Sequence, residues 1–291
     1  MVNFDILFQT MLNGLMQGGV YALIAIGLTL IYGVMKITNF AHGEFLMLGM
    51  YVTFWSFNIL NLDPYLGVFV SFAVLFILGA IFQKFLIEKV LGAEPMNQIM
   101  LTTGLSTFLY SAAQFLWGAD NRTVSVSYAS ESFKLGPVVV NYTRLIAFSV
   151  SILLVTALFL FLKYSRTGKA LRAASQNRNA ASLMGIDVKK IYLLAFALGA
   201  ALAGSAGALL TPFQYINPMA GVPLSTLAFV VVVLGTMGNF LGALCGGLIV
   251  GVAEALGGFV LGPQAKSLVS LLIFIIVLLF KPSGLFGGEK S

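Results

Sequence analysis

Residues 163–190, KYSRTGKALRAASQNRNAASLMGIDVKK, form a long polar stretch between two almost uninterrupted apolar runs. Seven of the chain's sixteen Lys and Arg residues lie in this stretch, against a single acid, Asp187. Because Lys and Arg accumulate in the cytoplasmic loops of membrane proteins, the stretch predicts a cytoplasmic segment and orients the rest of the chain. It is too long for a simple turn, so we expect it to dock onto something in the cytoplasm.

The composition excludes a soluble globular protein. The chain has 291 residues, of which 59% are hydrophobic and 9% charged, and its mean hydropathy is +0.98; soluble domains carry about a quarter charged residues. The net charge of +6 is concentrated in one loop, which favours membrane topology over nucleic-acid binding. The lone Cys245 excludes a disulfide framework. Because Met1 to Gln9 lacks basic residues and the apolar run continues to Tyr32, we expect no cleavable signal peptide.

The apolar pattern predicts an all-α polytopic membrane protein with one transmembrane domain over residues 1–291. A helix needs about 20 apolar residues to cross a bilayer. With residues 163–190 inside, nine crossings put the N-terminus outside, the C-terminus inside and residues 118–142 in an outer loop. There, the alternation from Val124 to Tyr128 suggests a short strand or extended segment. If the short 222–237 segment is re-entrant, the count falls to eight. The expected spans are 10–32, 43–61, 65–84, 97–117, 143–162, 191–211, 222–237, 240–261 and 267–281.

Small residues recur at a spacing of four, which lets helix backbones approach closely in lipid. Ordinary packing of helices within the chain is the simpler explanation of these rows, and low-cost sliding of helices is the functional one. The rows are Gly238, Gly242 and Gly246; Gly247 and Gly251; and Gly199, Ala203 and Gly207.

A polar segment, residues 38–44, interrupts the apolar sequence and includes Asn39, His42, Gly43 and Glu44. One interpretation is an interfacial turn whose side chains cap helix ends and pair with Lys36. The other is a broken helix that lines a substrate path. Residue types alone favour the interfacial turn, since most polar turns in membrane proteins are structural. A metal site is not expected, because two potential ligands lack a third.

Glu254 is the one acid deep inside an apolar span, and an intramembrane carboxylate is a functional hypothesis by default. The alternative is that it faces a partner helix or reaches the headgroups, since Gly262 ends the span shortly after it. The chain has no Gly-x-x-x-x-Gly-Lys-Ser/Thr loop, so we do not expect it to hydrolyse nucleotide by that route. No catalytic residue and no cofactor are predicted.

A short helix is expected inside the basic stretch. Asn177 is a good N-cap, the helix runs from Arg178 to Met184, and Gly185 stops it in the left-handed conformation. No Trp or Phe occurs between Ser165 and Ile191 to anchor the segment in lipid, so we favour docking onto a protein over a membrane surface. The expected apolar face is Ala180, Ala181, Leu183 and Met184, with Lys169, Arg172 and Arg178 polar.

Several segments together resemble the permease family of ATP-driven branched-chain amino acid importers, specifically its LivH-like subunit. The resemblance covers nearly the whole chain, and Asn39-Phe40-Ala41-His42-Gly43-Glu44 is one of its most specific parts. The other segments are 21–33 (YALIAIGLTLIYG), 166–173 (RTGKALRA), 180–185 (AASLMG), 216–218 (INP) and 279–287 (LFKPSGLFG).

The resemblance implies a multi-pass permease of the bacterial inner membrane. Its partners would be a second permease subunit, two cytoplasmic ATPase subunits, a periplasmic substrate-binding protein and an amino-acid substrate, with no nucleic acid. Residues 118–142 become a periplasmic loop and 163–190 a cytoplasmic coupling loop. The family's Glu-Ala-Ala-x-x-x-Gly element corresponds to Asn179-Ala180-Ala181-x-x-x-Gly185, with Asn in place of Glu. The implied coupling residues are Arg172, Arg178, Asn179, Ala180, Ala181, Met184 and Gly185.

The resemblance also favours a break that lines or braces the path at Asn39, His42, Gly43 and Glu44, with Glu254 as a further candidate. Two alternatives remain open. One is a sibling importer of the same architecture for urea or short amides. The other is a proton-coupled secondary transporter that uses His42, Glu44 and Glu254 as its coupling groups.

Overall fold

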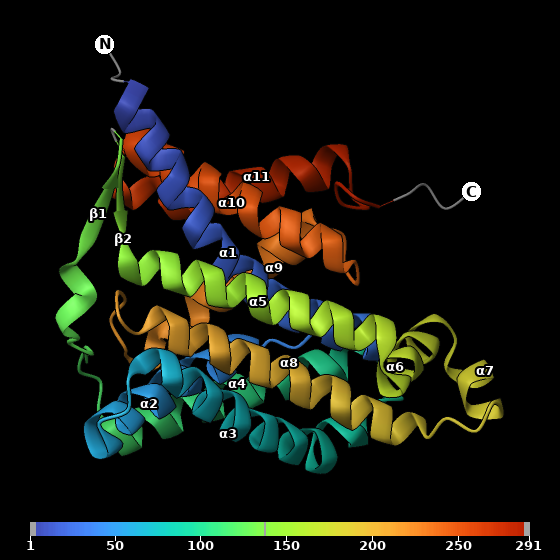
Figure 1. The fold of residues 1–291 in the computed structure, drawn as a ribbon. Helices are drawn as coiled ribbons and strands as arrows, with labels where there is room; N and C mark the ends of the chain where they lie inside the picture. The colour runs from blue at the N-terminus through green and yellow to red at the C-terminus, as the bar shows by residue number, and fades with distance from the viewer. Residues whose placement is uncertain (1–3, 137, 288–291) are drawn as a thin grey trace.

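The structure, a computed structural model, describes residues 4–136 and 138–287, and helices dominate it (Figure 1). The long helices are α1 (Phe4–Met35), α2 (His42–Leu60), α3 (Pro64–Phe85), α4 (Pro95–Trp117), α5 (Tyr142–Tyr164), α8 (Val188–Leu210), α9 (Gly221–Leu234), α10 (Phe240–Leu261) and α11 (Lys266–Phe280). The shorter elements are α6 (Arg166–Gln176), α7 (Arg178–Leu183), strands β1 (Ser132–Leu135) and β2 (Val138–Asn141), and four 3₁₀ turns, Ile87–Val90, Ser127–Ser130, Pro218–Ala220 and Pro263–Ala265.

The predicted all-α polytopic architecture is confirmed. Within the described residues, seven helices are long and apolar enough to cross a membrane: α1, α3, α4, α5, α8, α10 and residues Pro263–Phe280 around α11. Helices α2 and α9 match the expected segments 43–61 and 222–237 in position but are not among these seven. Both begin inside the bundle.

Polar segments gather at the two ends of the bundle as the alternation of spans predicts. At one end, Asp63 accepts a hydrogen bond from the Tyr128 hydroxyl (2.5 Å), and Arg122 pairs with Ile216 across an isolated β-bridge. At the opposite end, α6 and α7 project beyond the other helices (Figure 1), and Lys189 forms a salt bridge of 3.0 Å with Glu88. The basic stretch therefore lies away from the 118–142 loop.

Helices α1 and α8 form the core of the bundle, and small residues bring their neighbours close. A Cβ added to Gly251 on α10 would lie 2.4 Å from the Cα of Gly18 on α1. One added to Gly207 on α8 would lie 2.2 Å from the carbonyl oxygen of Leu46 on α2. The glycine rows are thus explained by helix packing within the chain.

Two local expectations differ from the structure. The Val124–Tyr128 alternation, expected to be a short strand or extended segment, forms no strand: Val126 is extended and Ser127–Ser130 is a 3₁₀ turn, while the strands β1 and β2 form an antiparallel hairpin later in the loop. Alternation alone does not make a strand, because a strand also needs a partner for its backbone. The basic stretch also contains a helix that we did not expect, α6, whose N-cap Ser165 accepts a hydrogen bond from the Gly168 N–H.

Candidate functional site

The chain breaks between α1 and α2 deep inside the bundle. Helix α1 ends at Met35, Lys36 has a φ of 58°, and residues 36–41 are not helical before α2 begins at His42. The His42 Nε2 lies 3.0 Å from the carbonyl oxygen of Ile24. Ile24 precedes the end of α1 by eleven residues, so at 1.5 Å per residue α2 begins roughly 16 Å back along α1.

The polar side chains of this break are buried by the protein. Asn39 and His42 are fully buried and Glu44 is 1% exposed. The Asn39 Oδ1 accepts a hydrogen bond from the Ala41 N–H (3.1 Å), and the Gly43 N–H donates to the Ser225 Oγ (2.8 Å). A buried polar group without a partner is costly, and these contacts satisfy two of the backbone N–H groups that the break exposes.

Helix α9 begins against the same place. A Cβ on Gly43 would lie 2.1 Å from the Gly221 carbonyl oxygen, and one on Gly221 would lie 2.4 Å from the Glu44 Oε2. The Glu44 Oε1 accepts a hydrogen bond from the Ser106 hydroxyl of α4 (3.2 Å), whereas Oε2 has no such partner among the described residues. The N-terminal ends of α2 and α9 therefore meet inside the bundle. We call this contact the α2–α9 junction.

This geometry distinguishes between the two interpretations of residues 38–44. An interfacial turn would leave the side chains of Asn39, His42 and Glu44 near solvent, but all three are buried. The Lys36 ammonium lies 5.4 Å from the Tyr32 ring centroid and makes no salt bridge in the described part of the chain. The segment is a break within the bundle, and its role in transport remains a proposal.

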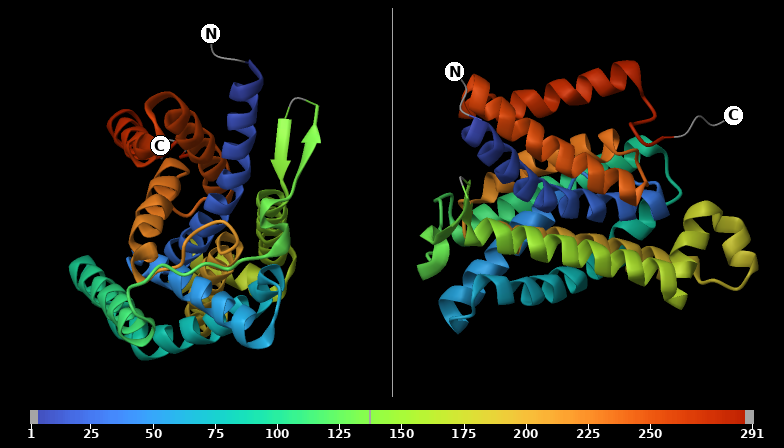
Figure 2. Two further views of the ribbon diagram at one scale, coloured as in Figure 1. Left: turned by 90° about the vertical axis from the view of Figure 1, so that its left-hand side faces the viewer. Right: turned by 45° about the horizontal axis from the view of Figure 1, so that its top comes forward.

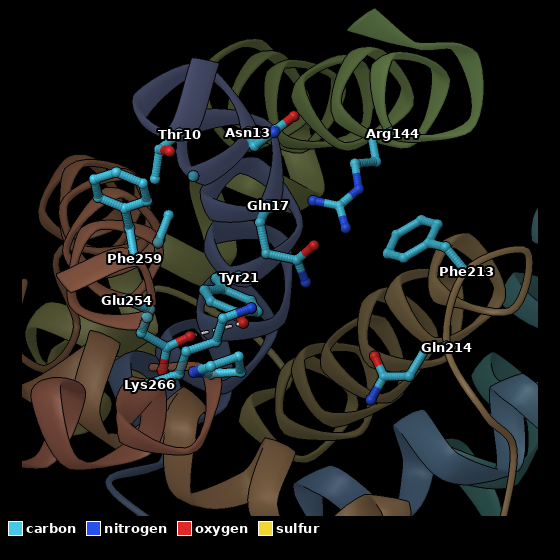
Figure 3. Close-up of a pocket in the computed structure, with 15 residues that line it drawn as sticks. Thr10, Asn13, Gln17, Tyr21, Arg144, Phe213, Gln214, Glu254, Phe259 and Lys266 are labelled. Carbon is cyan, nitrogen blue, oxygen red and sulfur yellow. Dashed lines mark hydrogen bonds between the residues drawn. The ribbon is translucent and has the colours of Figure 1, made fainter. Parts of the chain in front are cut away.

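Glu254 lies in a separate cavity near the end of the bundle that holds the β-hairpin. The cavity has a volume of about 430 Å³ and lies between α1, α5, α10, the start of α11 and the loop after α8 (Figure 3). Glu254 is 8% exposed and accepts a hydrogen bond from the Tyr21 hydroxyl (2.9 Å). Asn39, His42 and Glu44 do not line this cavity, so the structure does not bring all the predicted path residues together.

The basic stretch folds as the cap residues predict. Asn177 caps α7 by accepting a hydrogen bond from the Ala180 N–H (3.0 Å), and Gly185 has a φ of 81°. Leu183 and Met184 are 88% and 83% exposed. Ala181 differs from the expectation, because it is 3% exposed and packs into its own chain. On so short a helix the side facing the protein is set by how the flanking segments dock, which the sequence pattern does not reveal.

The predicted basic residues of the loop also contact their own chain. The Arg178 guanidinium lies 5.6 Å from the Tyr192 ring centroid, and Arg172 donates a hydrogen bond to the Lys163 carbonyl oxygen (3.4 Å). Asn179 and Ala180 are exposed. At the start of α8, the hydrogen bond from the Lys190 N–H lowers the pKa of the Asp187 carboxyl. These contacts hold the loop in place and leave Ala180, Leu183 and Met184 as its projecting apolar surface.

The sequence analysis missed a polar stripe on α4. Thr103, Thr107 and Ser111 recur at a spacing of four and are exposed, although α4 is long and apolar enough to span a membrane. Gly104, beside them, has nothing within 4 Å of an added Cβ. The spacing is present in the sequence, but only the fold shows that this face is uncovered. Hydroxyl-bearing and small residues are typical of contacts between membrane helices.

A buried helix break, close glycine packing and membrane-length apolar helices define a polytopic α-helical membrane protein. Residues 10–278 match the family described as "Branched-chain amino acid transport system / permease component". The chain belongs to this family. It is a transport permease, not an enzyme, which agrees with the predicted multi-pass permease of a bacterial inner membrane.

Relatives of nearly the same length support this assignment. The chain is 36% identical to the high-affinity branched-chain amino acid transport system permease protein BraD of Pseudomonas aeruginosa, over 97% of this chain and 96% of BraD. It is 33% identical to the protein LivH of Escherichia coli, with the same coverage of 97% and 96%. A probable branched-chain amino acid transport permease of Methanocaldococcus jannaschii is 30% identical over 95% of this chain and 91% of its own length.

Proposed function

We propose that the chain forms half of the translocation path of an ATP-driven importer for branched-chain amino acids. A second permease subunit would provide the other half, two cytoplasmic ATPases would supply the energy, and a periplasmic binding protein would deliver the substrate. The branched-chain substrate rests on the names of the relatives at 30–36% identity. The chain itself performs no covalent chemistry.

The observation that carries this proposal is the projecting end of α7. Large exposed apolar side chains on a polar, basic segment mark a protein contact. Leu183 and Met184 are exposed, while Ala181, buried beneath them, fixes α7 to its own chain. Because α7 is fixed to the rest of the chain, a displacement of its exposed end by a partner would be transmitted to the helices that follow, whereas a flexible loop would not transmit it.

Helix α8 would carry such a displacement from the exposed end of α7 to the α2–α9 junction. Helix α8 follows α7 directly, and its glycines Gly199 and Gly207 lie against α1 and α2 in its C-terminal half. A Cβ on Gly199 would lie 2.8 Å from the Gly27 carbonyl oxygen, and one on Gly207 would touch Leu46. Closure of an ATPase dimer on α7 would therefore shift α8 against the helices that hold the break. Such movement of packed helices opens one side of a path and closes the other.

The exposed stripe of α4 fits the second permease subunit. Threonine and serine hydroxyls facing lipid would have no partner beyond their own helix, whereas against another helix they hydrogen-bond and allow close packing. The Thr107 Oγ1 donates to the Thr103 carbonyl oxygen within α4 (3.1 Å). We therefore assign Thr103, Gly104, Thr107 and Ser111 to the contact between the two permeases.

The test is to replace the projecting side chains and measure both assembly and transport. Leu183→Asp and Met184→Asp should abolish copurification of the ATPases and leucine uptake, while leaving the amount of permease in the membrane unchanged. The matched control is Val139→Asp, an exposed apolar residue of the β-hairpin at the opposite end. It should retain ATPase copurification. Uptake that persists without any ATPase and collapses with the proton gradient would refute the proposal in favour of a secondary transporter.

A further inference from the structure

The cavity around Glu254 brings charged groups of both signs together in one pocket that is open to solvent. Glu254 comes from α10, whereas Arg144 comes from the first turn of α5 (Figure 3). The amide side chains of Asn13, Gln17 and Gln214 also line the cavity, and that of Gln17 lies between Tyr21 and Arg144 in Figure 3. A charge of either sign is costly to keep away from water unless it finds a partner. The arrangement therefore suits a ligand that itself carries both charges.

The acidic side of the cavity is prepared to accept a cation. Tyr21 donates a hydrogen bond to the Glu254 Oε2, which orients the carboxylate. An ionised carboxylate has about four acceptor sites, so it can accept further donors. Lys266, which is exposed, also lines the cavity and its positive charge acts on Glu254, but it makes no salt bridge with the carboxylate in the described part of the chain. An ammonium group could therefore be accommodated on Glu254.

The basic side is equally available. The Arg144 guanidinium lies 5.9 Å from the Phe213 ring centroid, and neither salt bridge found among the described residues includes it. A guanidinium binds a carboxylate through two parallel hydrogen bonds, which fixes the orientation of the ligand. In Figure 3 the side chain of Arg144 points into the cavity, toward Gln17.

The rest of the lining offers apolar surface to an aliphatic group. This surface comes from Phe259 of α10 and from Phe213 in the loop after α8, since the glycines of α10 are already packed against α1 and Lys266. Ligand pockets commonly pair such an apolar wall with a few polar groups that set orientation.

At the acidic side, Tyr21 is one helical turn from Ile24, whose carbonyl oxygen contacts His42. A ligand on Glu254 would therefore sit next to the helix that holds the break.

We propose that this cavity binds a zwitterionic α-amino acid, with Arg144 on its carboxylate, Glu254 on its ammonium group and an aliphatic side chain against α10. This inference rests on the proposed function and locates a substrate-binding site within it. A phosphatidylethanolamine headgroup also carries an ammonium and an anion, so the experiment distinguishes it from a free amino acid.

The experiment measures binding of radiolabelled leucine to the purified permease–ATPase assembly, without the binding protein, in phosphatidylcholine nanodiscs. Leucinamide, which lacks the carboxylate, and 4-methylpentanoate, which lacks the ammonium, serve as competitors. Arg144→Gln should weaken leucine binding about 10- to 100-fold. It should leave the inhibition constant of leucinamide unchanged, because leucinamide has no carboxylate for Arg144 to bind. Glu254→Gln should weaken leucine binding similarly. It should leave the inhibition constant of 4-methylpentanoate unchanged, because 4-methylpentanoate has no ammonium group for Glu254 to bind.

Lys134→Gln, on the exposed face of the β-hairpin, is the matched control and should bind leucine like the wild type. If Glu254→Gln fails to assemble, Tyr21→Phe replaces it and should weaken leucine binding severalfold. The proposal is overturned if the wild type binds no leucine, if both substitutions leave binding intact, or if phosphatidylethanolamine displaces leucine. Uptake that still depends on Leu183 and Met184 would then leave the proposed function standing.

Discussion

At the scale of single residues, neighbouring positions in α7 have opposite roles. Ala181 is buried against its own chain, whereas Leu183 and Met184 project from it. A charge at Ala181 would therefore disturb the loop itself, and a charge at Leu183 would disturb only what the loop touches. The distinction matters for mutagenesis, because loss of transport at Ala181 does not by itself report a lost partner contact.

Gly185 allows a sharper test of the same loop. Its φ of 81° suits glycine or asparagine, and nothing lies within 4 Å of an added Cβ, so backbone conformation alone limits substitution. Gly185→Asn should retain most leucine uptake, whereas Gly185→Val should lose most of it. Uptake and ATPase rate in proteoliposomes check this. Equal activity of the two variants would show that the end of α7 does not require the left-handed conformation.

At the scale of elements, the α2–α9 junction depends on two glycines whose backbones meet. Because an added methyl group at Gly43 would overlap the Gly221 carbonyl oxygen, Gly43→Ala should destabilise the protein by about 1–3 kcal/mol. Gly92→Ala is the matched control, since nothing lies within 4 Å of its added Cβ. Thermal unfolding of the detergent-solubilised assembly compares them. Equal melting temperatures would mean that the junction can relax.

Helix α4 carries a separate prediction. In a Cys245→Ser background, Thr107→Cys labelled with a photoactivatable maleimide should crosslink to the second permease subunit in native membranes. Leu153→Cys on α5, also exposed but on an apolar helix, should not when labelled in the same way. Gel shifts after illumination report the result. Crosslinking at Leu153 without crosslinking at Thr107 would move the contact away from α4.

At the scale of the whole molecule, the two ends of the bundle differ in charge and shape. Figure 2 shows the β-hairpin and the start of α1 at one end, with α6 and α7 at the other. The Cys245→Ser background again provides the test. A membrane-impermeant maleimide should label Ser132→Cys in intact cells and Ser182→Cys only after lysis, since both positions are exposed. The reverse pattern would invert the topology and remove the ATPase contact.

The sequence by itself determined the class of fold, the approximate position of nearly every long helix and the caps of α7. Apolar segments of membrane length, Asn177 before a short helix and Gly185 after it are local signals, so no knowledge of distant residues is needed. The segregation of basic residues likewise predicted which segments share one end of the bundle, because charge follows topology.

Only the tertiary structure decided which polar residues meet. His42 contacts Ile24, Gly43 meets Gly221, and Glu254 shares a cavity with Arg144 through helices far apart in sequence. Residue types could not separate an interfacial turn from a buried break, since both place Asn, His and Glu between apolar runs. Burial depends on how far the chain turns back along α1 before α2 begins, and that is set by packing across the whole bundle.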